Sequence, residues 1–292
     1  MTFHVKHLLL ALALLCFPAW AGGEAVTLPG TDIELKGQLY RPAGRGSFPA
    51  IVMLHGCSGM WARSGKPLSS YEFWAEHFRD LGYVALLLDS FGPRREREIC
   101  THSQRRITPQ RERASDARAA LMWLAGQAGV RGEDIHLAGW SNGGSAVLQA
   151  LRPDESTTGQ PSFRSAIAFY PGCAQLLKGA FVPRVPLLIL AGAEDDWTPA
   201  AKCQALARRA REAGAPVEIE VYEGAHHAFD RIAGSLRYRP EVRNPSSATG
   251  WGAHVGPHPE ARRKALERAT AFIQRPLGVP RGTGVGGPDR FP

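Results

Sequence analysis

The sequence lacks any apolar run long enough for a permanent membrane span, which needs about 20 residues. Its run at 8–17 is shorter, follows Lys6, and precedes the small residues Ala19 and Ala21. A basic start, a short apolar core and small residues at alternate positions are typical of a cleaved secretory signal. We therefore predict a signal peptide at 1–21 with cleavage near Ala21. No stable membrane anchor is expected, and the mature chain is predicted to be periplasmic or secreted.

Cysteine is also scarce, with five residues in 292, and no two are close enough for the Cys-x-x-Cys half-site of a zinc centre. We therefore predict no metal. Export would place the cysteines beyond the leader in an oxidising compartment, where an even number favours disulfides. Those four are Cys57, Cys100, Cys173 and Cys203. Three pairings are open to them. We favour Cys57–Cys100 with Cys173–Cys203, because each pair follows neighbouring predicted strands, and buried free thiols are the alternative.

The sequence also lacks a long continuous run of residues that carry the same charge. The net charge is +8, and removal of the leader, whose one charge is Lys6, leaves +7. Arginines are densest at 94–113, where Glu96, Glu98 and Glu112 alternate with them. Mixed signs are typical of a solvated, salt-bridged loop, so we predict no nucleic-acid partner.

Short apolar runs alternate with stretches of helical periodicity. The runs lie at 50–54, 84–88, 135–138, 166–170, 187–191 and 217–222, and the helical stretches at 71–81, 111–125, 145–151, 199–213 and 260–273. Continuous apolar runs suit strands that are buried on both faces, so the pattern predicts an α/β fold with a mostly parallel, doubly wound sheet flanked by helices.

One domain is predicted at 22–275. It begins with an antiparallel strand pair within 26–40, and the aperiodic stretch 232–258 is interpreted as a long loop. The Gly/Pro/Arg-rich segment 276–292 is predicted to be a disordered tail. A monomer is expected.

The sequence Gly139-Trp140-Ser141-Asn142-Gly143 fits the pattern G-x-S-x-G between a predicted strand and a predicted helix. In that context the serine lies on a sharp turn that raises its hydroxyl above the strand ends, and glycines permit the close approach of strand and helix. Ser141 is thus the candidate nucleophile. The alternative is an ordinary glycine-rich turn.

A serine hydroxyl needs a base, and the base needs a carboxylate to orient it. His226 and His227 follow the last predicted strand, while Asp195 and Asp196 follow the one before it. The chain order Ser, Asp, His is the order that this fold requires. A surface acidic turn and a loop histidine are the competing interpretations of these residues.

An oxyanion hole needs two backbone N–H donors. Asn142, directly after the nucleophile, is predicted to supply one, and Cys57 in the loop after an earlier strand the other. A Cys57–Cys100 bridge would brace that loop. Trp140, Trp197 and His55 are candidate walls of the substrate pocket. The stretch 232–258, which follows the histidines, is a candidate cover.

Taken together, these residues resemble the dienelactone hydrolase family over about residues 26–274. The resemblance is carried by His55-Gly56-Cys57, Asp89-Ser90-Phe91-Gly92-Pro93-Arg94, Gly139 to Gly144, Asp195-Asp196-Trp197-Thr198-Pro199 and Ala225-His226-His227-Ala228-Phe229. It implies an α/β-hydrolase fold. It selects Asp195, four residues before a proline, and His227, two residues before a phenylalanine. The best-known members use cysteine where this chain has Ser141.

The resemblance implies hydrolysis of a carboxylic ester or lactone as a small-molecule substrate, through an acyl-enzyme and without a cofactor. An acyltransferase and a small serine peptidase would use the same three residues. A non-catalytic binding protein of the same fold is the alternative from outside the enzymes.

Overall fold

The computed structural model describes residues 22–153 and 159–276. The predicted signal peptide at 1–21, and the predicted tail after residue 276, lie outside the described residues. Within these ranges, no helix is both long and apolar enough to cross a membrane.

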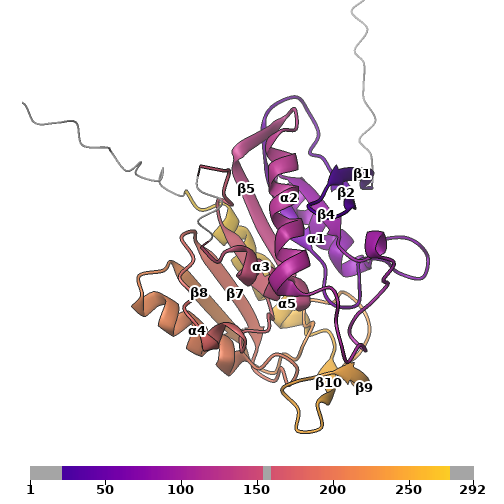
Figure 1. The fold of residues 1–292 in the computed structure, drawn as a ribbon, viewed down its shortest axis with the longest axis vertical. Coiled ribbons are helices and arrows are strands. Elements are labelled where there is room, and N and C mark those ends of the chain that lie inside the picture. The colour runs from indigo at the N-terminus through magenta and orange to yellow at the C-terminus, as the bar shows by residue number, and fades with distance from the viewer. Residues whose placement is uncertain (1–21, 154–158, 277–292) are drawn as a thin grey trace, which may run out of the picture.

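An eight-stranded sheet forms the centre of the molecule, with the strand order β1-β2-β4-β3-β5-β6-β7-β8 (Figure 1). The strands are β1 (Glu24–Pro29), β2 (Glu34–Tyr40), β3 (Phe48–Leu54), β4 (Val84–Asp89), β5 (Val130–Trp140), β6 (Ala166–Phe169), β7 (Leu187–Gly192) and β8 (Val217–Tyr222). Every predicted apolar run is a strand. β4 and β7 are buried along their whole length, which explains why their sequences show no polar alternation.

The sheet is parallel from β4 through β8, and β2 runs antiparallel to both of its neighbours. The predicted antiparallel pair within 26–40 is therefore confirmed as β1 and β2. Because the parallel strands all end at the same edge, the loops that follow β3, β5, β7 and β8 meet there.

Helices cover both faces of the sheet (Figure 1). They are α1 (Ser69–Asp80), α2 (Ala114–Ala125), α3 (Asn142–Ala150), α4 (Ala200–Glu212) and α5 (Pro259–Ile273). One apolar cluster joins the sheet to α2, α3 and α4, and a second joins its other face to α1 and α5. α1 shows the sequence origin of this packing, since its buried side chains Tyr71, Trp74, Ala75 and Phe78 repeat at helical spacing.

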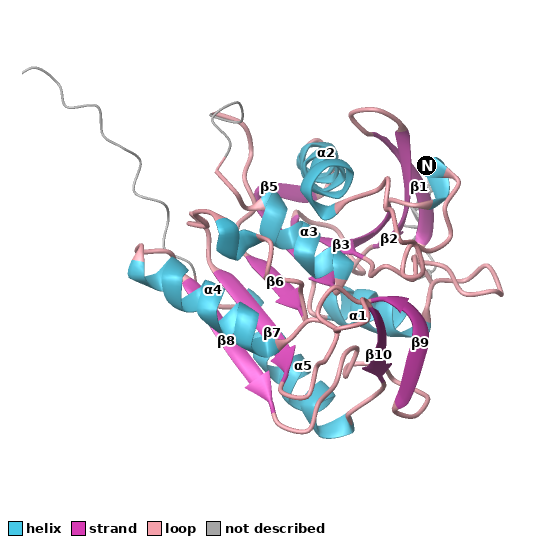
Figure 2. Cartoon of the chain, turned by 60° about the horizontal axis from the view of Figure 1, so that its bottom comes forward, coloured by secondary structure: helices cyan, strands magenta, loops and turns pink. Residues whose placement is uncertain are grey.

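The stretch 232–258 is more ordered than the sequence predicts. It contains a hairpin of two antiparallel strands, β9 (Arg237–Arg243) and β10 (Trp251–Val255), which stands apart from the main sheet (Figure 2). The interpretation of this stretch as a loop was wrong because β9 carries almost no apolar signal. Among its seven residues, Val242 is buried, four are charged and four are exposed.

Many bonds fix this hairpin to the rest of the molecule. The Arg243 N–H donates to the carbonyl of Cys100, and the indole of Trp197 donates to the carbonyl of Arg243. The structure pairs Cys57 with Cys100 and Cys173 with Cys203, which confirms the favoured disulfides. The first disulfide therefore links the loop after β3 to the segment on which β9 is anchored.

Candidate active site

Ser141 lies at the junction of β5 and α3, in the tight turn that the motif predicts. Its φ of 55° and ψ of −115° belong to a conformation that residues other than glycine rarely adopt. The glycines are needed for close approach, because a Cβ on Gly143 would collide with the Leu54 carbonyl and a Cβ on Gly139 with Gly143. The strain is localised at the residue whose side chain must be presented.

The three residues selected in the sequence form one continuous chain of hydrogen bonds. His227 Nε2 lies 2.8 Å from Ser141 Oγ, and His227 Nδ1 lies 2.8 Å from Asp195 Oδ2. The imidazole is 2% exposed and lies against the rings of Tyr170 and Trp197, each at a centroid distance of 4.7 Å. The imidazole is therefore held between two aromatic side chains, with one nitrogen facing Ser141 and the other facing Asp195.

Asp195 is also fixed from its other side. Its Oδ1 accepts hydrogen bonds from the backbone N–H groups of Trp197 and Thr198, at 2.9 and 2.8 Å. The Thr198 hydroxyl lies 2.9 Å from Asp195 Oδ2 and 3.1 Å from His227 Nδ1. The role of Thr198 was missed in the sequence, although it lies within the Asp-Asp-Trp-Thr-Pro segment that carried the resemblance.

Asp196 and His226, the alternatives to Asp195 and His227, make their contacts with other residues than Ser141. Asp196 accepts from the backbone N–H of His254 at 2.9 Å, and its Oδ2 lies 2.7 Å from His254 Nδ1. The His226 ring lies against the His254 ring, with centroids 5.7 Å apart. Asp196 and His226 therefore attach β10 to the body of the protein, whereas Asp195 and His227 approach Ser141.

Two backbone amides close to Ser141 have no acceptor within the described residues. Asn142 occupies the first position of α3, where an N–H group has no intrahelical acceptor. Cys57 lies in the loop after β3, and within the described ranges its N–H donates to no protein group. A Cβ on Gly56 would come within 3.4 Å of the Ser141 Cβ, so this loop passes close to the serine.

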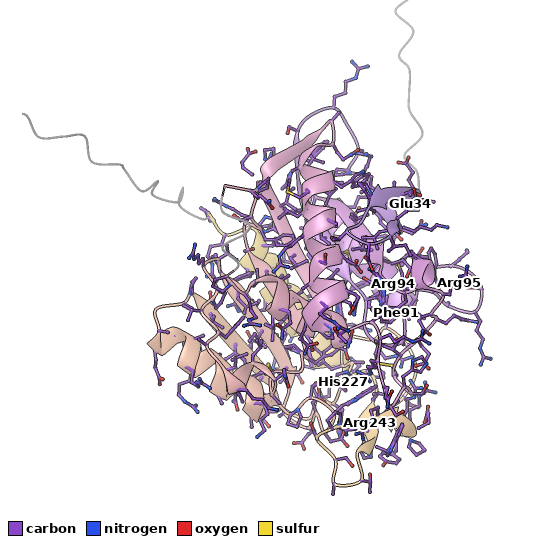
Figure 3. The ribbon with its side chains drawn as sticks, viewed as in Figure 1. Glu34, Phe91, Arg94, Arg95, His227 and Arg243 are labelled. Carbon is purple, nitrogen blue, oxygen red and sulfur yellow. A yellow bond between two sulfur atoms is a disulfide. The ribbon has the colours of Figure 1, made fainter. Side chains whose placement is uncertain are left out.

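A cavity of about 650 Å³ opens beside these groups. Ser141, Cys57, Asn142 and Trp197 all line it, and so do Arg243, Pro245 and Ser246 of the hairpin segment. Figure 3 shows His227 and Arg243 at the same end of the molecule. The prediction of Trp197 as a pocket wall agrees with this lining.

Trp140 and His55, the other two predicted walls, do not line the cavity. Trp140 is 1% exposed, because its side chain lies on the opposite face of β5, stacked on Phe169 at a centroid distance of 4.9 Å. Its indole N–H donates to Asp230 at 2.8 Å. His55 is 0% exposed and packs against Phe91.

Asp230 is a buried residue that connects several side chains near the site. Its carboxylate accepts hydrogen bonds from Trp74, Trp140 and Tyr170, at 2.8, 2.8 and 2.7 Å. Burial raises the pKa of Asp230, and the three donors oppose that rise. Because Trp140 precedes Ser141 and the Tyr170 ring contacts the His227 ring, this carboxylate connects the end of β5 to the His227 loop.

Buried His55 is expected to make the stability of the folded protein depend on pH in acid. Burial, together with the positive charge of Arg113, lowers the pKa of His55 to about 3. In the unfolded chain a histidine binds a proton below about pH 6.5, while the folded protein resists it until about pH 3. This residue should therefore reduce the free energy of unfolding as the pH falls through that interval, by up to about 1.4 kcal/mol per unit.

Urea unfolding across that interval would measure the effect. His55→Asn is expected to flatten the dependence of stability on pH, whereas His102→Asn, at a partly exposed histidine, should leave the slope unchanged. Equal slopes for His55→Asn and the wild-type protein would contradict the assignment.

The strand order, the turn at Ser141 and the Ser–His–Asp geometry together define an α/β-hydrolase. The dienelactone hydrolase family matches residues 35–277, so the chain belongs to this family and is an ester-hydrolysing enzyme. The match covers β2 from its second residue, the main sheet from β3 to β8, and every site residue described above.

Individual relatives are distant in sequence. The chain is 23% identical over 248 residues to a Bradyrhizobium protein named "Probable 2-oxo-3-(5-oxofuran-2-ylidene)propanoate lactonase", which covers 78% of this chain and 92% of that protein. Among solved structures, esterase 2 of Thermogutta terrifontis phosphoramylated by tabun matches with a TM-score of 0.61. It is 23% identical in sequence, and the match covers 88% of this chain and 95% of the esterase chain. The same esterase with propionate bound matches with a TM-score of 0.59.

Proposed function

We propose that the protein is an exported serine hydrolase that cleaves a carboxylic ester or lactone through an acyl-enzyme. The observation that carries this proposal is the chain of 2.8 Å contacts from Ser141 through His227 to Asp195. Export is supported by the predicted signal peptide and by two disulfides, which persist in oxidising compartments.

In this mechanism the Ser141 hydroxyl attacks the carbonyl carbon while His227 Nε2 takes the hydroxyl proton. Asp195 holds the ring by its Nδ1–H and stabilises the imidazolium. The imidazolium then donates its proton to the leaving alkoxide, and the ester bond breaks. Water, activated by the same nitrogen, attacks the acyl-enzyme and releases the carboxylic acid.

The tetrahedral intermediate carries a negative charge on the former carbonyl oxygen. The N–H groups of Asn142 and Cys57 are the donors for that oxygen. Asn142 lies at the N-terminus of α3, where the helix dipole contributes a partial positive charge. The Cys57–Cys100 disulfide holds the second donor in place.

The cavity also favours a substrate with a negative charge. Arg105, Lys202 and Arg243 line it, and none of the three forms an ion pair with a carboxylate within the described residues. Burial lowers the pKa of Arg105, Glu98 opposes that shift and Arg243 adds to it, which indicates that the two guanidinium charges are close. We therefore propose an ester or lactone that bears a carboxylate. The name of the Bradyrhizobium relative, a propanoate lactonase, agrees with this.

A pair of p-nitrophenyl esters, one neutral acetate and one hemisuccinate, tests the substrate class. The hemisuccinate is expected to have the higher kcat/KM. Arg105→Gln should lower that value by about 10- to 100-fold through KM, because a charged hydrogen bond contributes about 1.5–3 kcal/mol. The acetate should be unaffected, and Arg131→Gln, distant at the start of β5, should change neither ester. Equal losses on both esters would contradict the proposal.

A further inference from the structure

Arg113 is the most deeply buried charged residue beneath the cavity. It ends the turn Pro109–Arg113, which leads into α2, and its side chain is 0% exposed. Its Nη1 donates to the side-chain oxygen of Asn142 at 2.7 Å, and its guanidinium carbon lies 5.0 Å from the centre of the Phe91 ring. Phe91 is labelled in Figure 3, next to Arg94, whose N–H donates to the Phe91 carbonyl.

Among the residues that the structure describes, no carboxylate forms an ion pair with Arg113. Its Nε and Nη2 are buried and make no hydrogen bond within the described residues. The nearby Asp116 is engaged by both terminal nitrogens of Arg94, at 2.8 and 2.9 Å. Asp89 accepts from Trp61 and from the N–H groups of Phe91 and Gly92.

Burying a charge without a direct partner costs stability. Desolvation lowers the pKa of Arg113 to about 10, so the guanidinium remains charged at neutral pH. The chain therefore keeps a buried cation at a cost in stability, and within the described part of the chain its one hydrogen bond is to Asn142.

Asn142, which accepts the hydrogen bond from Arg113, is a residue of the proposed oxyanion hole. It lines the cavity, directly follows Ser141 and begins α3. A hydrogen bond to its side chain fixes the first turn of α3, and hence the direction of the Asn142 N–H. In a poorly polarisable interior, a fixed positive charge also acts over a longer distance than it does in water.

We propose that Arg113 is a positioning residue of the oxyanion hole. Its guanidinium holds Asn142 and places a positive charge behind the Asn142 amide, where it stabilises the oxyanion as that charge develops. This inference rests on the proposed function, in which Asn142 is one of the two donors. It assigns a role to a residue that does not itself line the cavity.

Steady-state kinetics and thermal unfolding of three variants test the role. Arg113→Met is expected to lower kcat for p-nitrophenyl acetate by about 10- to 100-fold, less than the about 10²–10³ for losing a donor itself. KM should stay unchanged, and Tm should be equal to or above that of the wild type. Arg113→Lys should restore most of kcat. Arg131→Met, which removes an arginine at the far end of β5, should keep the wild-type kcat.

Arg113→Gln separates the two parts of the role, because glutamine still offers a donor to Asn142 but has no charge. If Arg113→Gln has a kcat near that of Arg113→Met, the positive charge is what matters for the rate. Arg113→Gln also replaces the methionine variant as the test if that variant fails to fold. The inference is overturned if a folded Arg113→Met or Arg113→Gln enzyme keeps the wild-type kcat. It is also overturned if the lysine variant loses as much kcat as the methionine variant.

Labelling of the wild-type protein by a fluorophosphonate separates this inference from the one on which it rests. A wild-type enzyme that neither reacts with the probe nor hydrolyses the ester overturns the proposed function, and the role of Arg113 with it. A labelled, active wild-type enzyme with an unaffected Arg113→Met variant overturns the role of Arg113 alone.

Discussion

Replacing Ser141 with alanine is expected to lower kcat for p-nitrophenyl acetate by about 10⁶-fold, to a rate set by the oxyanion hole and binding alone. The loss should be this large because no acyl-enzyme can form without the Ser141 hydroxyl. The fold should persist, since alanine meets the same backbone requirement at φ 55° and removes one oxygen atom. Steady-state rates and circular dichroism would measure both outcomes.

Ser145→Ala is the matched control for this experiment. Ser145 also lines the cavity, but its hydroxyl accepts from the Gly172 N–H and lies 3.2 Å from the Ser141 carbonyl, away from His227. The Ser145→Ala enzyme should still react with a fluorophosphonate probe, whereas Ser141→Ala should not. Retained labelling and hydrolysis in Ser141→Ala would refute the nucleophile and leave a binding protein as the better interpretation.

Asp195→Asn is expected to lower kcat by about 10⁴-fold with little change in KM, because an amide in this position favours the wrong imidazole tautomer. The same change at Asp196 should have a far smaller effect, since the Asp196 carboxylate contacts His254, whereas the Asp195 carboxylate contacts His227. Two identical substitutions at adjacent residues thus separate orientation of the base from attachment of the hairpin.

The pH profile of kcat/KM provides the second measurement for this pair. Asp196→Asn should keep the wild-type pH profile. The kcat/KM of Asp195→Asn should instead recover only at higher pH. If Asp196→Asn were the more damaging substitution at every pH, the assignment of the acid would be wrong.

Most of the fold could be predicted from the sequence because its signals are local. Strands buried on both faces, such as β4 and β7, must be continuous apolar runs, and the turn at Ser141 requires glycines at fixed offsets. The chain order of Ser141, Asp195 and His227 then follows from which strands they terminate. These features depend on short stretches of chain and on the order in which parallel strands end at one edge.

The features that were missed depend on contacts between distant segments. β9 is a strand although its residues are mostly charged, because it pairs with β10 and is anchored to Cys100. The direction of Trp140 and the burial of Arg113 follow from neighbours 90 and 29 residues away in the chain, Asp230 and Asn142. No local pattern marks such partners, so a tryptophan beside Ser141 was interpreted as a pocket wall.

The attachment of the β9–β10 hairpin determines how substrate range and rate are coupled. His227 forms a parallel bridge with Val255, the Gly256 N–H donates to the His227 carbonyl, and His254 contacts Asp196. A hinged flap would have to break these bonds to open, and breaking them would displace the base. The wall of the pocket and the proposed base are therefore joined by the same backbone contacts. Any redesign of the hairpin that shifts β10 will alter turnover along with selectivity, whereas exchange of side chains on an unmoved hairpin leaves turnover intact.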